Sequence, residues 1–213
     1  MPDDEQVGSV RPVEQGILRA VRADDLAALR LWESDPTVAA WMTTTASRFD
    51  ARESAEQEYD RLVRTPRVKL LVIQLVAGEV VGFIRLNDLD MHARKATLRI
   101  LIGPRWQGQG YGSAALRQLI GYCFDELGLR RLGLVVRADN ARALGVYQRL
   151  GFVAEGRERD AAWVNGHWID FIHMGLLAPD WRDERADPMV GYVAGAELTQ
   201  AVAHPTTPKR EGE

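Results

Sequence analysis

The segment ATLRILIGPRWQGQGYGSAALRQLIGYCFDEL, residues 96–127, decides the fold because its pattern changes twice. Residues 96–103 form an apolar run with branched side chains, which predicts a buried strand. Residues 113–127 place apolar side chains at spacings of three and four, which predicts an amphipathic helix followed by a left-handed cap at Gly128. The apolar stripe consists of Leu116, Leu119, Ile120, Cys123, Phe124 and Leu127.

The glycine-rich turn between them, RWQGQGYG at residues 105–112, has the physical properties of an anion site. Glycines let the backbone turn sharply and approach a ligand, and the unpaired N–H groups of a helix N-terminus attract a phosphate. The dinucleotide pattern G-x-G-x-x-G fails because Ser113 replaces its third glycine, and no Gly-Lys-Ser/Thr of a P-loop follows. These residues alone leave two interpretations open, a pyrophosphate cradle and a tight turn that binds nothing.

Upstream of this segment, the pattern predicts a strand, several helices and a hairpin. Two β-branched runs broken at Ala77-Gly78 are typical of a hairpin. Asp24 or Asp25 is expected to cap a helix that ends at Trp32 and presents an apolar face. The expected elements are a strand at 17–21, helices at 24–32, 35–42 and 50–63, the hairpin at 68–86 and a polar loop at 87–95.

Downstream, the chain predicts another strand, a capped helix and a second hairpin. Asn140 stands at the start of the helix, where asparagine is a preferred cap, and Asn165-Gly166 is a dipeptide favoured in tight hairpin turns. The expected elements are a strand at 131–138, a helix at 139–150 and paired strands at 152–164 and 167–177. Together they predict an α/β fold, with a mixed sheet covered by helices.

Composition restricts the classes of function. The chain has 213 residues, of which 46% are hydrophobic and 27% charged, as in ordinary globular domains. A net charge of −3 and a pI near 5.9 predict no nucleic-acid partner, and no apolar run is long enough to predict a membrane span. With Cys123 as the only cysteine and no ligand spacing among the histidines, no metal is expected.

We expect one domain at 17–178, between a flexible N-terminal arm at 1–16 and a mobile C-terminal tail at 179–213. The polar, acidic first residues are unlike a signal peptide, so a cytoplasmic location is expected.

The motif RWQGQG at 105–110 fits the R/Q-x-x-G-x-G/A coenzyme A signature and so resembles the GNAT superfamily of N-acetyltransferases. The run WQGQGYGSAAL at 106–116 and residues 140–174 are similar to its subgroup of ribosomal-protein N-terminal and spermidine acetyltransferases. The resemblance implies a GNAT fold, whose mixed, mostly antiparallel central sheet is splayed between strands 96–103 and 131–138 to admit acetyl-CoA, with helices on both faces. It also implies direct transfer of the acetyl group to a primary amine.

The resemblance implies roles for particular residues. Backbone groups of Leu101 and Ile102 would contact the pantetheine arm, which Asn140 would also contact, and Arg142 would reach the phosphate end. The pyrophosphate would be held by a turn that Arg105 opens and that consists of Gln107, Gly108, Gln109, Gly110, Tyr111 and Gly112.

Tyr147 matches the family's tyrosine that protonates the departing thiolate, a step suited to a phenol. Its helical position is equally that of a core residue facing Ala143, Leu144 and Leu150. Many relatives carry an acidic base on the strand before the glycine turn, but this chain has Arg99 there and no carboxylate. The remaining candidates for a base are Glu33, Asp88, Asp90, His92 and a chain of water molecules.

Other functions and several acceptors stay open. A non-catalytic module that senses coenzyme A is an alternative, whereas the missing third glycine disfavours a nucleotide-dependent dehydrogenase. The acceptor could be a protein N-terminus, a polyamine, an aminoglycoside or another small amine, and the enzyme could be a homodimer.

Overall fold

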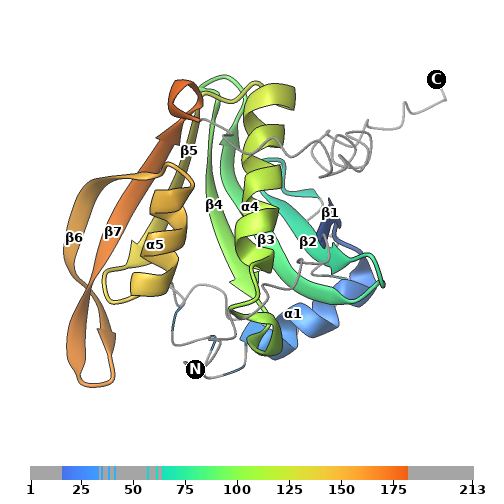
Figure 1. Cartoon of the computed structure of the whole chain (residues 1–213), viewed down its shortest axis with the longest axis horizontal. Helices are drawn as coiled ribbons and strands as arrows, with labels where there is room; N and C mark the ends of the chain where they lie inside the picture. The colour runs from blue at the N-terminus through green and yellow to red at the C-terminus, as the bar shows by residue number, and fades with distance from the viewer. Residues whose placement is uncertain are drawn as a thin grey trace, which may run out of the picture.

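The computed structural model describes residues 16–33, 35, 38, 41, 57, 61 and 64–181. Within them, seven strands form one sheet in the order β1-β2-β3-β4-β5-β7-β6 (Figure 1). All neighbouring strands are antiparallel except β4 and β5, which are parallel. The strands are β1 (Gly16–Ala20), β2 (Lys69–Leu75), β3 (Val80–Asp90), β4 (Lys95–Ile102), β5 (Arg131–Arg137), β6 (Val153–Val164) and β7 (His167–Leu177).

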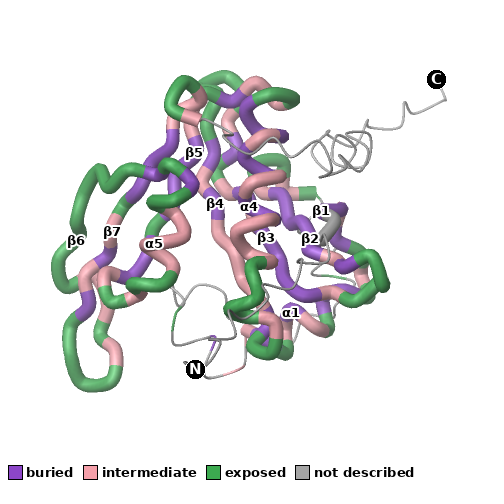
Figure 2. The backbone as a smooth tube through the Cα atoms, in the orientation of Figure 1, coloured by how far each residue is buried: buried purple, intermediate pink, exposed green. Residues whose placement is uncertain are grey.

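Helices cover both faces of this sheet. On one face, α4 (Tyr111–Gly121), its π-helical continuation (Tyr122–Glu126) and α5 (Ala141–Arg149) pack on the larger apolar core. On the other face, α1 (Leu26–Glu33) packs on a smaller cluster through Leu26, Leu29 and Trp32. Short 3-10 turns lie at Ala23–Asp25, Pro104–Trp106 and Ala178–Asp180. Buried segments concentrate in β2, β3 and β5, whereas the edge strand β6 is largely exposed (Figure 2).

The two parallel strands separate after a short contact. β4 and β5 pair only at Lys95–Arg131, Ala96–Leu132 and Thr97–Gly133. On its other side, β4 stays paired with β3 as far as Ile102, and β5 stays paired with β7 as far as Arg137. The sheet is therefore split open from Leu98 onward, which confirms the predicted splay between these strands.

The local predictions are confirmed for most elements. Both hairpins form, and Asn165 and Gly166 take the positive φ angles of 51° and 84° that their turn requires. Gly128 is left-handed, with φ 61°. Cys123 is fully buried, and burial raises the pKa of its thiol to about 12, which fits an apolar core residue.

Several local predictions were wrong. The expected loop at 87–95 is mostly strand, because β3 continues to Asp90 and only a short turn precedes Lys95. Glu155 and Arg157 both lie on β6, so they form no cross-strand pair with each other and instead pair with Arg131 and Asp170.

Not every expected segment lies within the described residues. The predicted helices at 35–42 and 50–63 fall largely outside them, as do the arm up to residue 15 and the tail from 182. The predicted domain boundaries therefore stay predictions.

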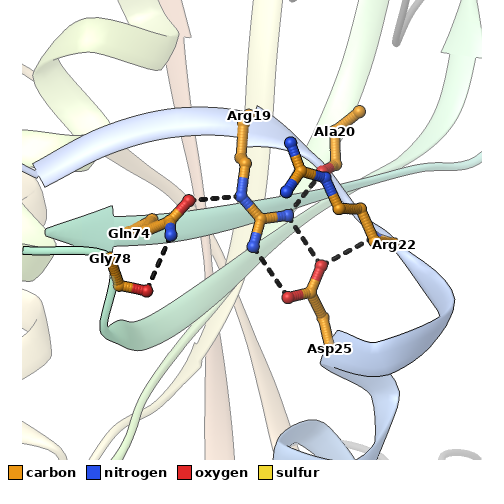
Figure 3. A network of polar contacts seen from close by, with 6 residues as sticks. All are labelled: Arg19, Ala20, Arg22, Asp25, Gln74 and Gly78. Carbon is orange, nitrogen blue, oxygen red and sulfur yellow. Dashed lines mark hydrogen bonds and ion pairs between the residues drawn. The ribbon is translucent and has the colours of Figure 1, made fainter. Parts of the chain in front are cut away.

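A buried ion pair joins the 3-10 turn that precedes α1 to strand β1 (Figure 3). The Asp25 carboxylate accepts two hydrogen bonds of 2.7 Å from Arg19 and one of 2.6 Å from the backbone N–H of Arg22. Arg19 also donates to Gln74 Oε1 at 2.5 Å. Asp25 therefore fixes the β1–α1 corner, and it does not cap α1 as the sequence suggested.

This ion pair predicts an acid-sensitive corner. Burial alone would raise the pKa of Asp25, but the hydrogen bonds from Arg19 and Arg22 and the charge of Arg19 outweigh it, so the pKa lies below its usual 3.8. The stability that Asp25 contributes is therefore present above about pH 4 and lost as pH falls through the lowered pKa. We expect Asp25→Asn to destabilise the fold by roughly 3–5 kcal/mol at pH 7, because it leaves Arg19 buried without its anion.

Urea unfolding from pH 3 to 7 measures this effect, with Asp24→Asn as the control because Asp24 is an exposed neighbour. Equal stability of the two variants at pH 7 would show that the ion pair does not stabilise the corner.

Candidate active site

The open edge of β4 is the first component of the site. The carbonyl of Arg94 accepts a hydrogen bond from the backbone of Arg131 in β5, and the N–H of Gly103 donates a hydrogen bond to the carbonyl of Val81 in β3. Along a strand, the backbone N–H and C=O groups of successive residues point to opposite sides. Those of Ile100 and Ile102 therefore point toward β5, beyond the last β4–β5 pair. Leu101 directs its own toward β3, where it pairs with Phe83. Of the two predicted pantetheine contacts, Ile102 therefore directs its backbone N–H into the splay, while its carbonyl accepts from Gln107, and Leu101 directs neither group there.

The glycine turn follows directly and is held by its own side chains. Gln107 Nε2 donates to the Ile102 carbonyl at 3.1 Å, and Gln109 Nε2 donates to the Arg105 carbonyl at 2.7 Å. Gly108 and Gly110 have φ angles of 84° and 90°, which only glycine adopts without strain. These contacts leave the N–H groups at the start of α4, from Tyr111 onward, free of helical partners, as at any helix N-terminus.

Trp106 anchors the turn to the α1 face of the sheet. Its ring packs edge-to-face on Trp32 with centroids 5.3 Å apart, and a Cβ at Gly103 would lie 2.6 Å from the Trp106 ring. Arg105 stacks on the same ring at 4.5 Å and bonds Glu79 at 3.0 Å. The guanidinium of Arg105 is therefore engaged with the β2–β3 turn.

The start of α5 meets this turn. A Cβ at Gly108 would lie 3.3 Å from Arg142 Nη2, so Arg142 stands directly over the turn. Asn140 Oδ1 accepts a hydrogen bond from the N–H of Ala143 at 3.0 Å and thus caps α5. The side-chain NH2 group of Asn140 can then make a further contact. The N-terminus of α4 and the guanidinium of Arg142 meet at this turn, an arrangement that fits a pyrophosphate and that a side chain at Gly108 would crowd.

Tyr147 lies on α5 and packs against the larger core, as its helical position predicted. Its ring meets Phe152 edge-to-face at 6.0 Å. Burial raises the pKa of the Tyr147 phenol to about 12, so the hydroxyl stays protonated throughout the physiological range. Tyr147 can be both a packing residue and a proton donor, because its ring makes the packing contacts and its hydroxyl would donate the proton.

The four candidate bases lie in different places. Asp90 ends β3 and His92 lies in the turn before β4, at the closed end of the splay, where backbone N–H groups of Ala93 and His92 lower the pKa of Asp90. Asp88 accepts a hydrogen bond from Thr97, next to the last β4–β5 pair. Glu33, at the end of α1, lies close enough to act electrostatically on Arg99, which belongs to the open part of β4.

Sequence reasoning missed Arg137, a buried arginine at the end of β5 with only 5% of its surface exposed. Its guanidinium is bonded to Asp139 at 2.9 and 2.6 Å and stacks over the Trp41 ring at 5.0 Å. The alternation of β5 could have placed Arg137 on the α1 face, but nothing in the sequence indicates that Trp41 covers it.

In the part of the chain that the structure describes, no group of three or more His, Cys, Asp or Glu side chains is arranged to hold a metal ion. None of the described helices has the length and apolar character needed to cross a membrane.

Comparison with known proteins agrees with this geometry. Residues 16–153 match the family model described as acetyltransferase (GNAT) domain. The chain is 37% identical over 111 residues to a putative ribosomal N-acetyltransferase of Bacillus subtilis, a match that spans 52% of this chain and 61% of that protein. It is 27% identical to the spermidine N(1)-acetyltransferase of Escherichia coli over 88% of this chain and 95% of that protein.

Two further relatives are informative. An L-amino acid N-acetyltransferase of Escherichia coli is 35% identical over 55% of this chain and 74% of that protein. The crystal structure of a Vibrio cholerae spermidine N-acetyltransferase with CoA and spermine has the same fold, with a TM-score of 0.70, 23% identity and coverage of 78% of this chain and 97% of that one.

The chain belongs to the GNAT acetyltransferase family. It is an N-acetyltransferase, and acetyl-CoA is its acyl donor. The predicted family, fold class and cosubstrate are thereby confirmed.

Proposed function

We propose that this enzyme transfers acetyl groups to primary amines by direct attack of the amine on the thioester, without a covalent enzyme intermediate. The observation that carries the proposal is the unpaired edge of β4, which ends in a glycine turn contacted by the Arg142 side chain of α5. An extended ligand arm can pair with such an edge as an added strand, while its phosphates bind at the turn.

Each component of the site has a role in this proposal. The backbone N–H groups from Gly108 to Gly112 and the guanidinium of Arg142 would hold the pyrophosphate, whereas the N–H of Gln107 donates to the Pro104 carbonyl. Ile102 and Asn140 would contact the pantetheine arm. Bound acetyl-CoA supplies an electrophilic thioester carbonyl, and the N–H groups on the open edge of β4 are placed to stabilise negative charge that develops on its oxygen.

Proton transfer sets the remaining requirements. An alkylammonium with a pKa of ~10.4 is neutral in only about one molecule in a few thousand at pH 7, so a proton must leave before attack. Glu33 is the candidate base that adjoins the open part of β4. The phenol of Tyr147 would return a proton to the departing thiolate.

Binding of acetyl-CoA should stabilise the folded chain. At ~100 times its dissociation constant the ligand should add about 2.7 kcal/mol to the free energy of unfolding. A thermal melt with and without acetyl-CoA measures the shift, with NAD as the control nucleotide, and thiol release with an amine panel then reports turnover. A shift with NAD but none with millimolar acetyl-CoA would contradict the cradle, and binding without turnover of any amine would favour a sensor.

A further inference from the structure

Arg99 is a half-buried arginine in the open part of β4. Residues 97, 99 and 101 share the face of the sheet that α1 covers, since Leu101 packs with the Trp32 cluster and Arg99 pairs directly opposite Arg85. Arg99 lies one residue from Ile100 and three from Ile102, which is ~3–10 Å along the strand from the backbone groups of the open edge. Arg99 therefore belongs to the stretch of β4 whose open edge would carry the thioester, and it lies on the α1 face of that stretch.

This guanidinium carries an unused hydrogen-bond donor. Arg99 Nη2 is buried and has no hydrogen-bond partner among the described residues. A buried charged donor without a partner costs free energy, and burial accordingly lowers the pKa of Arg99, although the charge of Glu33 opposes the shift. An anion that bonded Nη2 would remove this cost.

The neighbouring charges define what kind of anion fits. Arg137 shares the α1 face but is already neutralised by Asp139, so it does not compete for the ligand. Glu33 provides a carboxylate close to Arg99. Together, Arg99 and Glu33 offer a cation and an anion, which complement a molecule that carries both charges, as an amino acid does. A polyamine, which carries only positive charge, would meet Arg99 with like charge.

We propose that Arg99 binds the carboxylate of the acceptor, and that the preferred acceptors are amino acids or other small amines with an adjacent carboxylate. This inference rests on the proposed function, because it names the acceptor class of the same site. Arg99 here determines specificity and makes no contact with the acetyl group. Removing the carboxylate from the acceptor, or the charge from Arg99, should weaken the same interaction.

The test compares matched acceptors on the wild-type enzyme. Each L-amino acid is assayed beside its carboxamide and its decarboxylated amine, with spermidine included, and kcat/KM is expressed per neutral amine because the carboxylate changes the pKa of the amine. We expect the best amino acid to exceed its carboxamide by ~10²-fold, the discrimination typical of a lost charge-assisted bond. Carboxamides or spermidine acetylated as well as the amino acids would overturn the inference.

Variants of Arg99 test whether this residue causes the preference for acceptors that carry a carboxylate. Arg99→Gln should raise KM for the amino acid with little change in kcat, and should bring amino acid and carboxamide within about threefold of each other. Arg130→Gln is the control, because Arg130 is an exposed arginine at the closed end of the splay. An unchanged ratio in Arg99→Gln would overturn the assignment, and the wild-type comparison decides the acceptor class even if that variant does not fold.

The two proposals fail in different ways. Acetyl-CoA binding with no acetylated amine of any kind, as judged by mass spectrometry of the products, contradicts the proposed function. Acetylation of amines without preference for a carboxylate contradicts only the inference about Arg99.

Discussion

Gly110→Val should weaken acetyl-CoA binding by at least ~100-fold, equal to about 2.7 kcal/mol, while the chain still folds. Gly110 is the N-cap of α4 and has a φ of 90°, so a branched side chain there is strained and also occupies the approach to the free N–H groups of the helix. Isothermal titration with acetyl-CoA measures the loss of affinity, and circular dichroism monitors the fold.

The backbone strain needs its own control, and the chain offers one. Gly166 has a φ of 84°, and an added Cβ would meet nothing within 4 Å. Gly166→Val should therefore share the backbone penalty of ~1–2 kcal/mol but retain wild-type affinity. If both variants bind acetyl-CoA equally well, the glycine turn is a structural turn and not a cradle.

Tyr147→Phe should lower kcat by ~10²-fold, the usual contribution of a general acid, with acetyl-CoA affinity nearly intact. The ring keeps its contact with Phe152, and only the hydroxyl is lost. Because burial raises the pKa of Tyr147 to about 12, the wild-type hydroxyl stays protonated from pH 6 to 10. The ratio of wild-type to variant kcat should therefore be nearly constant across that range, as steady-state kinetics on one amine can measure.

Tyr122→Phe is the matched control, because Tyr122 is also a buried tyrosine, 1% exposed, but lies in the π-helical turn after α4. It should leave kcat within about twofold of wild type. A Tyr147→Phe enzyme within about threefold of wild type at every pH would assign the residue to packing alone, and the proton would then come from water.

Much of the fold could be predicted because its signals are local. The apolar periods of residues 96–103 and 113–127, the glycines at 108 and 110 and the Asn165-Gly166 turn each depend on neighbours within a few residues. Positive φ angles at these glycines and at Asn165 match that expectation. The wrong prediction of a loop at 87–95 shows the limit of such local signals, because polar side chains on an exposed hairpin extension do not distinguish strand from loop.

The site could be predicted only in part. Its glycine turn and the cap at Asn140 are local features of their helices, and the resemblance to a family supplied Tyr147. The roles of these residues remain predictions. Nothing in the sequence alone indicated that Leu101 turns its backbone toward β3, that Arg105 is engaged by Glu79, or that a carboxylate from α1 acts on Arg99.

By itself, the sequence determined the order of strands, turns and helices, because hydrophobic period, capping and turn chemistry act between residues close in the chain. Only the tertiary structure decided that β4 and β5 part after Thr97, that Arg142 stands over Gly108, and that Arg19 is neutralised by Asp25. The splay and the Arg142 contact join segments more than thirty residues apart, and the Arg19–Asp25 pair needs β1 and α1 to meet at a corner. Such contacts are fixed by how helices and strands pack, which no local pattern specifies.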